Sequence, residues 1–362
     1  MFRKLLALTI LFALLPGLSL ATKVSLLVHE SDTYAVQKAL SGLKLPEDIK
    51  VNTFHSIENI KNDSGKLEYI SDSEIILLDV MGSKYSEFLL ENLDPGSKQV
   101  YALNSGRDNQ KLRKQGILFD TDVRSYFRYK SVQNLQNMIR RALHKSLQRE
   151  ISFKEPVKRP DTGIYHPDSK KVFTEYSDYL QWYKDSGKYK QDRPWIGVLL
   201  YSSCLTPGKR AAYEYCLQSL ERAGFNLLAC YGYRNTEQVM DSYLSDQKEE
   251  ARIGALLSFS LKFQSAGNPR VKKALSELNV PVINAIKLFF NTAREWQEDP
   301  RGIVPSGVVT NIANPEVSGL IEPTVLMGKK RVREPELGDV YKTVPIKDNW
   351  QHLLQRLKKW VQ

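Results

Sequence analysis

Apolar runs that alternate with amphipathic stretches organise this chain, and the clearest example lies in its middle. Trp195–Tyr201 is an apolar run too short for a buried helix and typical of a strand that is buried on both faces. A Thr-Pro-Gly turn at residues 206–208 follows and predicts a helix that ends at Gly224. A second apolar run, Phe225–Tyr231, comes directly afterwards. This order predicts a parallel βαβ unit with a right-handed crossover.

The same alternation continues on both sides of this unit. Before it, the pattern predicts strands at residues 23–29, 49–54, 72–80 and 99–103 and an amphipathic helix at 132–147. After it, the pattern predicts strands at 253–259 and 280–286, with a helix at 271–278 between them. Strands and helices that alternate at these lengths indicate the α/β class, as two doubly wound parallel-sheet domains of the flavodoxin-like or Rossmann-like kind.

Changes in composition place the domain boundaries. Residues 1–21 are predicted to be a signal peptide and residues 22–150 an N-terminal flavodoxin-like domain. Residues 151–189 begin with prolines and charges, continue with an aromatic helical stripe, and are predicted to be a linker. Residues 190–328 form the second α/β domain, and residues 329–362 a basic C-terminal tail with a helix.

The N-terminus has the three parts of a secretory signal. Arg3 and Lys4 give a positive start, residues 5–15 a short apolar run, and Ser19-Leu20-Ala21 a small-residue cleavage site. We therefore expect cleavage after Ala21 and a periplasmic or otherwise exported protein. An uncleaved N-terminal anchor is the alternative, although Pro16 interrupts a run that is already short for a membrane span.

Positive charge is concentrated in two stretches. The net charge is +11 over 362 residues, with 14 Lys or Arg against 5 Asp or Glu at 107–159 and 9 against 4 at 329–362. Basic surface can meet nucleic acid, anionic lipid or an acidic small molecule. Export argues against nucleic acid, so we expect no nucleic-acid partner and leave open a membrane-surface contact through the basic tail or an ordinary solvated face.

Polar residues follow the predicted strands, where α/β sheets bind their ligands. In the second domain these are Ser202, Ser203 and Cys204, Ser258, Ser260 and Lys262, the 231–233 turn, and Asn284. In the first domain they are His29, Asp79, Asn104 and Ser105. No G-x-G-x-x-G follows the first strand and no G-x-x-x-x-G-K-[ST] occurs, so the chain lacks both the dinucleotide fingerprint and the P-loop.

The cysteines and histidines point to core packing more than to a metal centre. Cys204, Cys216 and Cys230 lack C-x-x-C spacing and read as small core residues. The five histidines show no H-x-x-x-H pair. His166, between Tyr165 and Pro167 in the predicted linker, is the best single candidate for a site residue, and bracing of the turn is the alternative.

Seven segments, in order along the chain, resemble a known family: the CobN-type large subunits of cobaltochelatase and magnesium chelatase. They are YALNSGRD (101–108), FDTDVRSYFRY (119–129), TGIYHPD (162–168), RPWIGVLLY (193–201), LERAGFNLLACYG (220–232), VPVINAI (280–286) and PEVSGLIEP (315–323). The chain is similar to the N-terminal portion of these proteins, which are typically well over a thousand residues long. The later segments that carry the family's metal-insertion carboxylates and histidines have no counterpart here.

This resemblance implies a tetrapyrrole ligand, with cobalt, magnesium or iron left open, bound in a cleft between the domains as part of metal insertion or removal. The candidate binding residues are Tyr165, His166, Arg193, Tyr201, Ser202 and Asn284. Arg193 is expected to pair a ring carboxylate, and His166 is the candidate axial ligand of the metal in the ring.

The alternative is a non-catalytic scaffold or truncated fragment that docks to the remainder of a split chelatase subunit through its basic C-terminal helix. Metal insertion needs groups that remove pyrrole protons and carry the ion. Paired carboxylates or histidines usually serve as these groups, and the matching segments contain no recognisable pair of this kind. We therefore expect no turnover by this chain alone.

Overall fold

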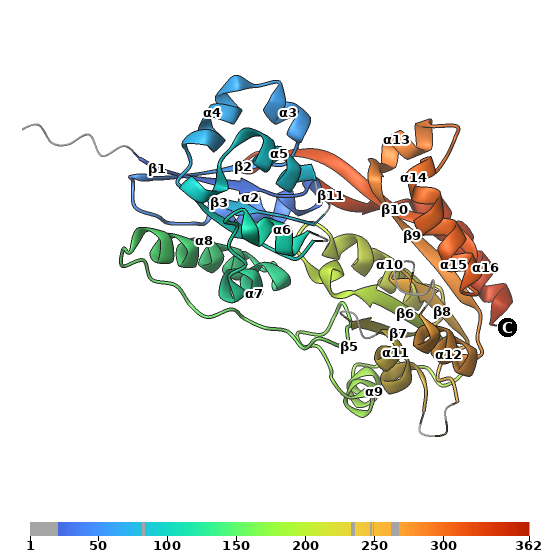
Figure 1. Cartoon of the computed structure of the whole chain (residues 1–362). Coiled ribbons are helices and arrows are strands. Elements are labelled where there is room, and N and C mark those ends of the chain that lie inside the picture. The colour runs from blue at the N-terminus through green and yellow to red at the C-terminus, as the bar shows by residue number, and fades with distance from the viewer. Residues whose placement is uncertain are drawn as a thin grey trace, which may run out of the picture. The chain divides into compact units, whose positions relative to one another are not determined.

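The chain forms two compact units, each built on its own sheet. Unit 1 comprises the residues up to Arg128 together with Gln133–Pro156, and unit 2 comprises Tyr129–Val132 together with Val157–Gln362. The computed structural model describes residues 21–81, 84–106, 108–232, 236–246, 248, 250–261 and 268–361 (Figure 1). The predicted signal peptide, apart from Ala21, and Lys262 lie outside the described residues.

Unit 1 contains a four-stranded parallel sheet with the order β2-β1-β3-β4. The strands are β1 (Thr22–Leu27), β2 (Ile49–Phe54), β3 (Ile75–Leu78) and β4 (Gln99–Ala102). All four residues of β3 are fully buried, as expected for a strand that is covered on both faces. From β1 the chain crosses to β2 on one side of β1 and then to β3 on the other side. The strand order therefore reverses between β1 and β3.

Helices cover both faces of this sheet (Figure 1). They are α2 (Thr33–Ser41), α3 (Ile57–Lys61), α4 (Ser64–Asp72), α5 (Lys84–Asn92), α6 (Asn109–Lys114), α7 (Thr121–Tyr129) and α8 (Val132–Leu147). One core cluster joins the strands to α3, α4, α5 and α6. Helix α8 lies beside α2, where the amide of Gln136 donates to the carbonyl of Ala39 at 2.9 Å.

Unit 2 contains a seven-stranded mixed sheet with the order β11-β10-β9-β8-β6-β7-β5. The strands are β5 (Gly163–Ile164), β6 (Trp195–Tyr201), β7 (Asn226–Gly232), β8 (Ala255–Ser258), β9 (Val282–Thr292), β10 (Ile321–Glu334) and β11 (Gly338–Pro345). The five central strands are parallel, whereas β5 and β11 pair antiparallel with β7 and β10. The predicted α/β class is therefore confirmed, but the expectation of an entirely parallel sheet is wrong for this unit.

Helices also cover the faces of the second sheet. They are α9 (Tyr176–Asp185), α10 (Arg210–Arg222), α11 (Thr236–Val239), α12 (Pro269–Leu278), α13 (Ala293–Glu298), α14 (Pro305–Val308), α15 (Asn314–Val317) and α16 (Lys347–Trp360), with π-helical turns at Met240–Leu244 and Val309–Ala313. Cys204, Cys216 and Cys230 lie in the core of this unit, as predicted. None of the described helices is both long and apolar enough to cross a membrane.

Two segments contribute more to unit 2 than their composition indicated. Within the predicted linker, β5 extends the sheet, and Tyr179 and Tyr183 of α9 are fully buried. Within the predicted tail, β10 and β11 form a hairpin that closes through Gly338, whose φ of +68° favours glycine. Trp350 of α16 is fully buried, so the C-terminal helix packs its apolar face into the core of its own unit.

Candidate functional site

The carboxyl ends of β6 and β8 mark the point where the strand order of the second sheet reverses. From β6 the chain crosses to β7 on one side, whereas β8 pairs with the other side of β6. Open α/β sheets bind ligands at such a point. Tyr201, the last residue of β6, donates a hydrogen bond from its hydroxyl to the carbonyl of Ser260 at 2.7 Å. Ser260 follows β8, so this bond joins the two diverging strand ends.

A tight turn carries the chain from β6 into α10. Residues Ser202–Leu205 form a 3-10 turn, and the hydroxyl of Thr206 donates to the carbonyl of Ser203 at 2.8 Å. Gly208 has a φ of +82°, and its carbonyl accepts a hydrogen bond from the backbone N–H of Thr343 at 2.7 Å. Helix α10 therefore begins at the carboxyl edge of the sheet, where its partially positive amino end favours anions.

Three basic residues come from the segment before β5, the start of α10 and β9, toward the carboxyl edge of the second sheet. Lys209, the N-cap of α10, is 6% exposed, and Lys287 of β9 is 8% exposed. Arg159 donates from Nη2 to the carbonyl of Ser202 at 3.3 Å. Burial raises the pKa of Cys204, and the positive charges of Lys287 and Lys209 act in the opposite direction. Burial lowers the pKa of Arg159. We call Arg159, Lys209 and Lys287 the basic cluster.

Two buried polar atoms beside these strand ends lack a hydrogen-bond partner among the described residues. They are the hydroxyl of Ser260, which is 3% exposed, and Oδ1 of Asn284, which is 1% exposed. Asn284 pairs in register with Ser258 of β8, and its Nδ2 donates to the carbonyl of Asn311 at 2.7 Å. Asn311 lies in the π-helical turn after α14, a local geometry that occurs frequently at functional sites.

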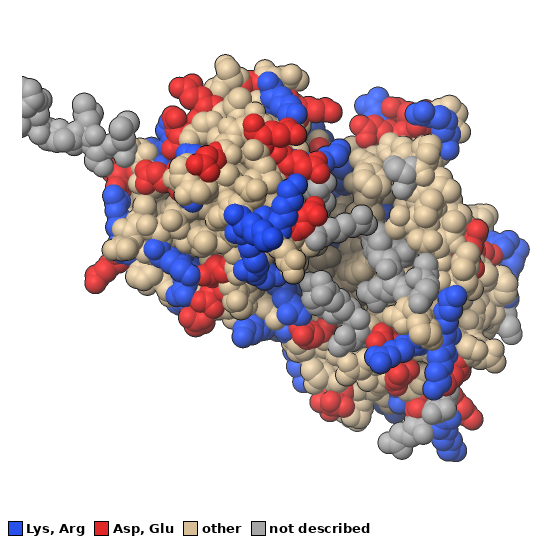
Figure 2. All heavy atoms as spheres, viewed as in Figure 1, with Lys and Arg blue, Asp and Glu red and all other residues tan. Residues whose placement is uncertain are grey.

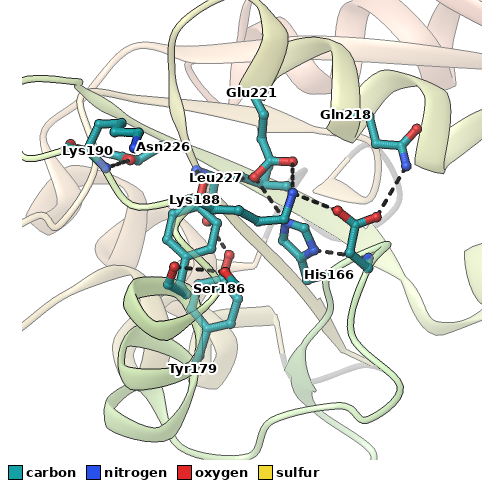
Figure 3. Close-up of polar contacts among 11 residues, drawn as sticks. His166, Tyr179, Ser186, Lys188, Lys190, Gln218, Glu221, Asn226 and Leu227 are labelled. Carbon is teal, nitrogen blue, oxygen red and sulfur yellow. Dashed lines mark hydrogen bonds and ion pairs between the residues drawn. The ribbon is translucent and has the colours of Figure 1, made fainter.

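His166 is fully buried and fully engaged by protein groups (Figure 3). Its Nδ1 accepts a hydrogen bond from the backbone N–H of Asp168 at 3.1 Å, so the proton is on Nε2. The Nε2–H then donates to Oε1 of Glu221 at 3.1 Å. Neither ring nitrogen offers a lone pair, and ligation of a metal would first require one of these bonds to break.

Glu221 is the centre of a polar network between α10, α9 and the segment after β5 (Figure 3). It accepts hydrogen bonds from His166, from the hydroxyl of Tyr183 at 2.9 Å and from Lys188 at 3.4 Å. Lys188 also pairs with Asp168 at 2.6 Å. The rings of Trp182 and Tyr183 enclose the imidazole, with centroids 4.9 and 5.7 Å away. This arrangement holds α9 and the chain after β5 against α10, which is a structural role.

Tyr165 and Arg193 are also held within the fold. Tyr165 is 4% exposed, and its hydroxyl donates to Glu214, which also accepts from Nε of Arg210 at 2.6 Å. Arg193 is half-buried, and its carbonyl accepts a hydrogen bond from Nδ2 of Asn226 at 2.7 Å.

The structure does not bring all six sequence-predicted residues to one place. Tyr201, Ser202 and Asn284 lie toward the carboxyl edge of the second sheet. Arg193 precedes β6 and therefore lies at the amino end, roughly 26 Å along the strand from Tyr201 at about 3.3 Å per residue. His166 lies beyond the pairing of β5 with β7, also on the side of the amino end. A single planar ring at the carboxyl edge, beside Tyr201, therefore does not reach Arg193 or His166 at the amino end.

Sequence reasoning missed the basic cluster, because its members come from three separate segments. Arg159 lies in the predicted linker, Lys209 follows the turn after β6, and Lys287 lies where the predicted strand at 280–286 had already ended. The Thr-Pro-Gly turn was a usable signal for Lys209, since the first residues of the following helix lie at the ligand-binding edge. Only the sheet order brings the other two to the same edge.

Unit 1 gathers polar groups at its own carboxyl edge. The carboxylate of Asp79 accepts from Nδ2 of Asn104 at 2.7 Å and from the backbone N–H of Met81 at 2.9 Å. Nε2 of His29 bonds the carbonyl of Met81 at 2.6 Å, and Arg124 donates to the hydroxyl of Ser105. Within the described ranges, no group of three or more His, Cys, Asp and Glu side chains is placed to hold a metal ion.

Comparison with known proteins places the chain in a family. A family model described as CobN/Magnesium Chelatase matches residues 124–362. The chain is 27% identical over 225 residues to the chloroplastic magnesium-chelatase subunit ChlH of Oryza sativa subsp. indica, which covers 59% of this chain and 16% of that protein. It is 22% identical over 303 residues to the aerobic cobaltochelatase subunit CobN of Pseudomonas aeruginosa, which covers 80% of this chain and 23% of that protein.

Among solved structures, the catalytic subunit of cobaltochelatase from Mycobacterium tuberculosis is similar with a TM-score of 0.49 and 16% identity, covering 92% of this chain and 26% of that one. The chain thus spans 16% of the ChlH subunit and 23% of the CobN subunit. Because the family model matches more than half of the sequence, the chain belongs to the CobN/Magnesium Chelatase family.

Proposed function

We propose that this chain binds a tetrapyrrole at the carboxyl edge of the second sheet and takes part in chelatase-type insertion or removal of the metal. Family membership carries this proposal, since the family model matches residues 124–362 and relatives named as magnesium-chelatase and cobaltochelatase subunits are similar over 59% and 80% of the chain. The strand reversal between β6 and β8 supports the location, because ligands bind at such points in α/β sheets. Cobalt, magnesium and iron rings are all candidate ligands.

The proposed role is binding, with the chemistry of metal exchange supplied elsewhere. Proton removal from a pyrrole needs a base within hydrogen-bonding reach of the ring. The carboxyl edge offers hydroxyl, amide and cationic groups, whereas the carboxylate of Glu221 is occupied by His166, Tyr183 and Lys188. We therefore propose that turnover requires further protein segments of the kind found in the longer relatives.

Fluorescence titration of purified residues 22–362 with protoporphyrin, and absorbance titration with haem and with cobalt and magnesium porphyrins, test this proposal. The expected result is saturable binding together with no metal insertion above that of a heat-inactivated sample. Absence of saturable binding to every ring would overturn the binding role, and turnover by the chain alone would overturn the non-catalytic assignment.

A scaffold that docks to another chelatase segment is the second candidate. Phe290 is 66% exposed, Val309 58% and Val317 72%, and few charged side chains lie over α14 and α15 on the face shown in Figure 2. Exposed apolar surface of this kind marks interaction sites. Docking through the basic C-terminal helix would have to use its exposed face, because its apolar face is buried in unit 2.

Export belongs to the same proposal and rests on the leader-like pattern of residues 1–21. Expression of the full chain in a bacterium, followed by fractionation and mass spectrometry, tests it. The expected product begins at Thr22 in the exported fraction, whereas a protein that keeps Met1 in the cytoplasmic fraction would contradict export.

A further inference from the structure

Unit 1 contains an open cavity of about 560 Å³ that the proposed function does not use. Its walls are one face of α8, the loop between α2 and β2 with Lys44 and Pro46, and residues 150–154. After α8 the chain turns back along the helix (Figure 1), and the backbone N–H of Lys154 donates to Oδ1 of Asn137 at 3.0 Å. All three walls belong to unit 1, so a single folded unit forms the cavity.

The wall from α8 is a polar face of the helix. It consists of Gln133, Gln136, Asn137 and Arg140, whose i, i+3, i+4, i+7 spacing places them on one side. From residue 133 to residue 140 this face extends about 10 Å, which equals the length of about three residues of an extended peptide. Nε2 of Gln136 donates to the carbonyl of Ala39, but no bond within the described chain occupies its Oε1 or the side-chain amide of Gln133.

Three cations at this cavity have no partner among the described residues. Lys44, Arg140 and Lys154 line it, and no hydrogen bond, ion pair or ring contact joins their side chains to the described part of the chain. The neighbouring basic side chains are paired instead: Arg141 with Asp122, Lys145 with Asp120 and Arg149 with Asp48. Against the three cations the lining has one acidic residue, Glu150, which gives a net charge of +2. The cavity therefore attracts anions.

The size and the chemistry of the cavity favour an acidic peptide over a small anion. Its volume lies in the range of about 300–1,000 Å³ that ligand pockets span, and a single inorganic anion would leave most of it filled with water. Lys and Arg form charge-assisted hydrogen bonds with carboxylates. The amides of α8 both donate and accept hydrogen bonds, as a peptide backbone does. Pro46 and Ile151 add apolar surface beside them.

We propose that this cavity binds an extended acidic peptide segment of a partner protein. Lys44, Arg140 and Lys154 bond its Asp or Glu carboxylates, and the free amide groups of α8 bond its backbone. The cavity belongs to unit 1, whereas tetrapyrrole binding is proposed for unit 2. The two proposals can therefore fail independently.

The first test uses the unmodified chain. Fluorescence anisotropy with fluorescein-labelled hexaglutamate and hexaglutamine peptides compares ligands of similar size that differ in charge. Hexaglutamate is expected to bind saturably at physiological salt, and hexaglutamine at least about tenfold more weakly, since it lacks the charge-assisted bonds. Equal affinities, or no saturable binding of hexaglutamate, would overturn the proposal. Displacement of hexaglutamate by citrate or by a hexathymidylate strand at equal concentration would also overturn it, since the cavity would then accept a small polyanion or a nucleic acid.

Variants test whether the peptide occupies this cavity. Arg140→Gln and Lys154→Gln each remove one cation and are expected to weaken hexaglutamate binding about tenfold, whereas Arg140→Lys keeps the charge and should lose much less. Lys61→Gln is the matched control, at an exposed lysine that ends α3 outside the cavity, and should leave the affinity unchanged. Equal losses for the control would show diffuse attraction to the basic surface and contradict the assignment. Unchanged affinity in both cavity variants would contradict it as well. Circular dichroism checks that each variant is folded.

Discussion

Nε2 of His166 donates to Oε1 of Glu221 across 3.1 Å, and this bond uses the last free position on the imidazole. The backbone N–H of Asp168 already occupies Nδ1. The residue whose sequence context indicated a metal ligand is therefore part of the packing between α9 and α10.

Removal of the Glu221 charge should destabilise unit 2. Glu221→Gln keeps the size of the side chain but weakens its bonds to His166, Tyr183 and Lys188. We expect a loss of about 1–3 kcal/mol in the free energy of unfolding, the range for a buried polar group left poorly paired. Urea denaturation followed by tryptophan fluorescence measures it. Glu277→Gln, which removes an exposed pair with Lys273, is the control and should change stability by less than about 0.5 kcal/mol.

The same network should make the protein sensitive to acid. Burial raises the pKa of Glu221, but the hydrogen bonds from His166 and Tyr183 outweigh it, so the pKa lies below its ordinary value of 4.5. The hydrogen bond from Lys188 likewise lowers the pKa of Asp168. Because these pKa values are depressed in the folded state, their stabilisation is present above the ordinary carboxyl pKa and is lost as the pH falls through the folded-state values.

Unfolding free energies measured in urea between pH 7 and pH 3 test this dependence. The wild type should lose stability below about pH 4.5, the ordinary pKa of the group, and Glu221→Gln should show a shallower decline. Parallel curves for the two proteins would show that Glu221 does not contribute to the acid sensitivity.

Substitution of His166 should affect stability and leave the spectrum of a bound metalloporphyrin unchanged. His166→Gln removes the imidazole that is hydrogen-bonded to Glu221 and Asp168. Because we expect no bond between this imidazole and the metal, its removal should leave the ligands of the metal unchanged. In absorbance titrations with haem, the position of the Soret band should be the same for variant and wild type. A shifted band in a folded variant, with folding checked by circular dichroism, would assign axial ligation to His166.

The C-terminal helix offers a pair of tryptophans with opposite environments. Trp350 is fully buried and Trp360 is 44% exposed. Trp350→Ala should lower the free energy of unfolding by about 3–5 kcal/mol. Trp360→Ala should lower it by only about 0.5–1 kcal/mol, as is typical of substitutions at the surface. Thermal melts of both variants test whether residues 347–360 belong to the core of unit 2, and equal small effects would place the helix outside it.

The three thiols should be unreactive in the native protein. Burial raises the pKa of Cys204, Cys216 and Cys230, and all three are buried. Iodoacetamide at pH 8 should modify none of them until urea is added, because the thiolate is the reactive form. Mass spectrometry of the labelled peptides provides the readout, and rapid native labelling of any one would show that its surroundings open.

Much of the fold followed from local pattern. Trp195–Tyr201 and the helix at 132–147 were predicted with the bounds that the structure shows, because a continuous apolar run and a helical period are both local signals. The β10–β11 hairpin was missed. Its strands carry Lys329, Lys330 and Arg331, whose charges concealed the alternation of a sheet edge.

The site was harder to predict than the sheet. Ser202 and Tyr201 were identified because they end a strand, which is a position along the sequence. Arg159 and Lys287 reach the same edge only through strand order, and no local pattern encodes that order. Arg193 was chosen for its charge next to β6, but it lies at the opposite end of the strand from Tyr201.

The two-residue strand β5 sets where unit 2 can be cut. It covers the outer side of β7 by pairing Ile164 with Cys230, and the phenol of Tyr179 donates to the carbonyl of Leu227 at 2.5 Å. A polypeptide that began at residue 190 would leave the backbone groups of β7 open to strands from other molecules, the usual route to edge-to-edge aggregation. A piece of unit 2 that keeps this edge of β7 paired therefore has to begin upstream of Gly163.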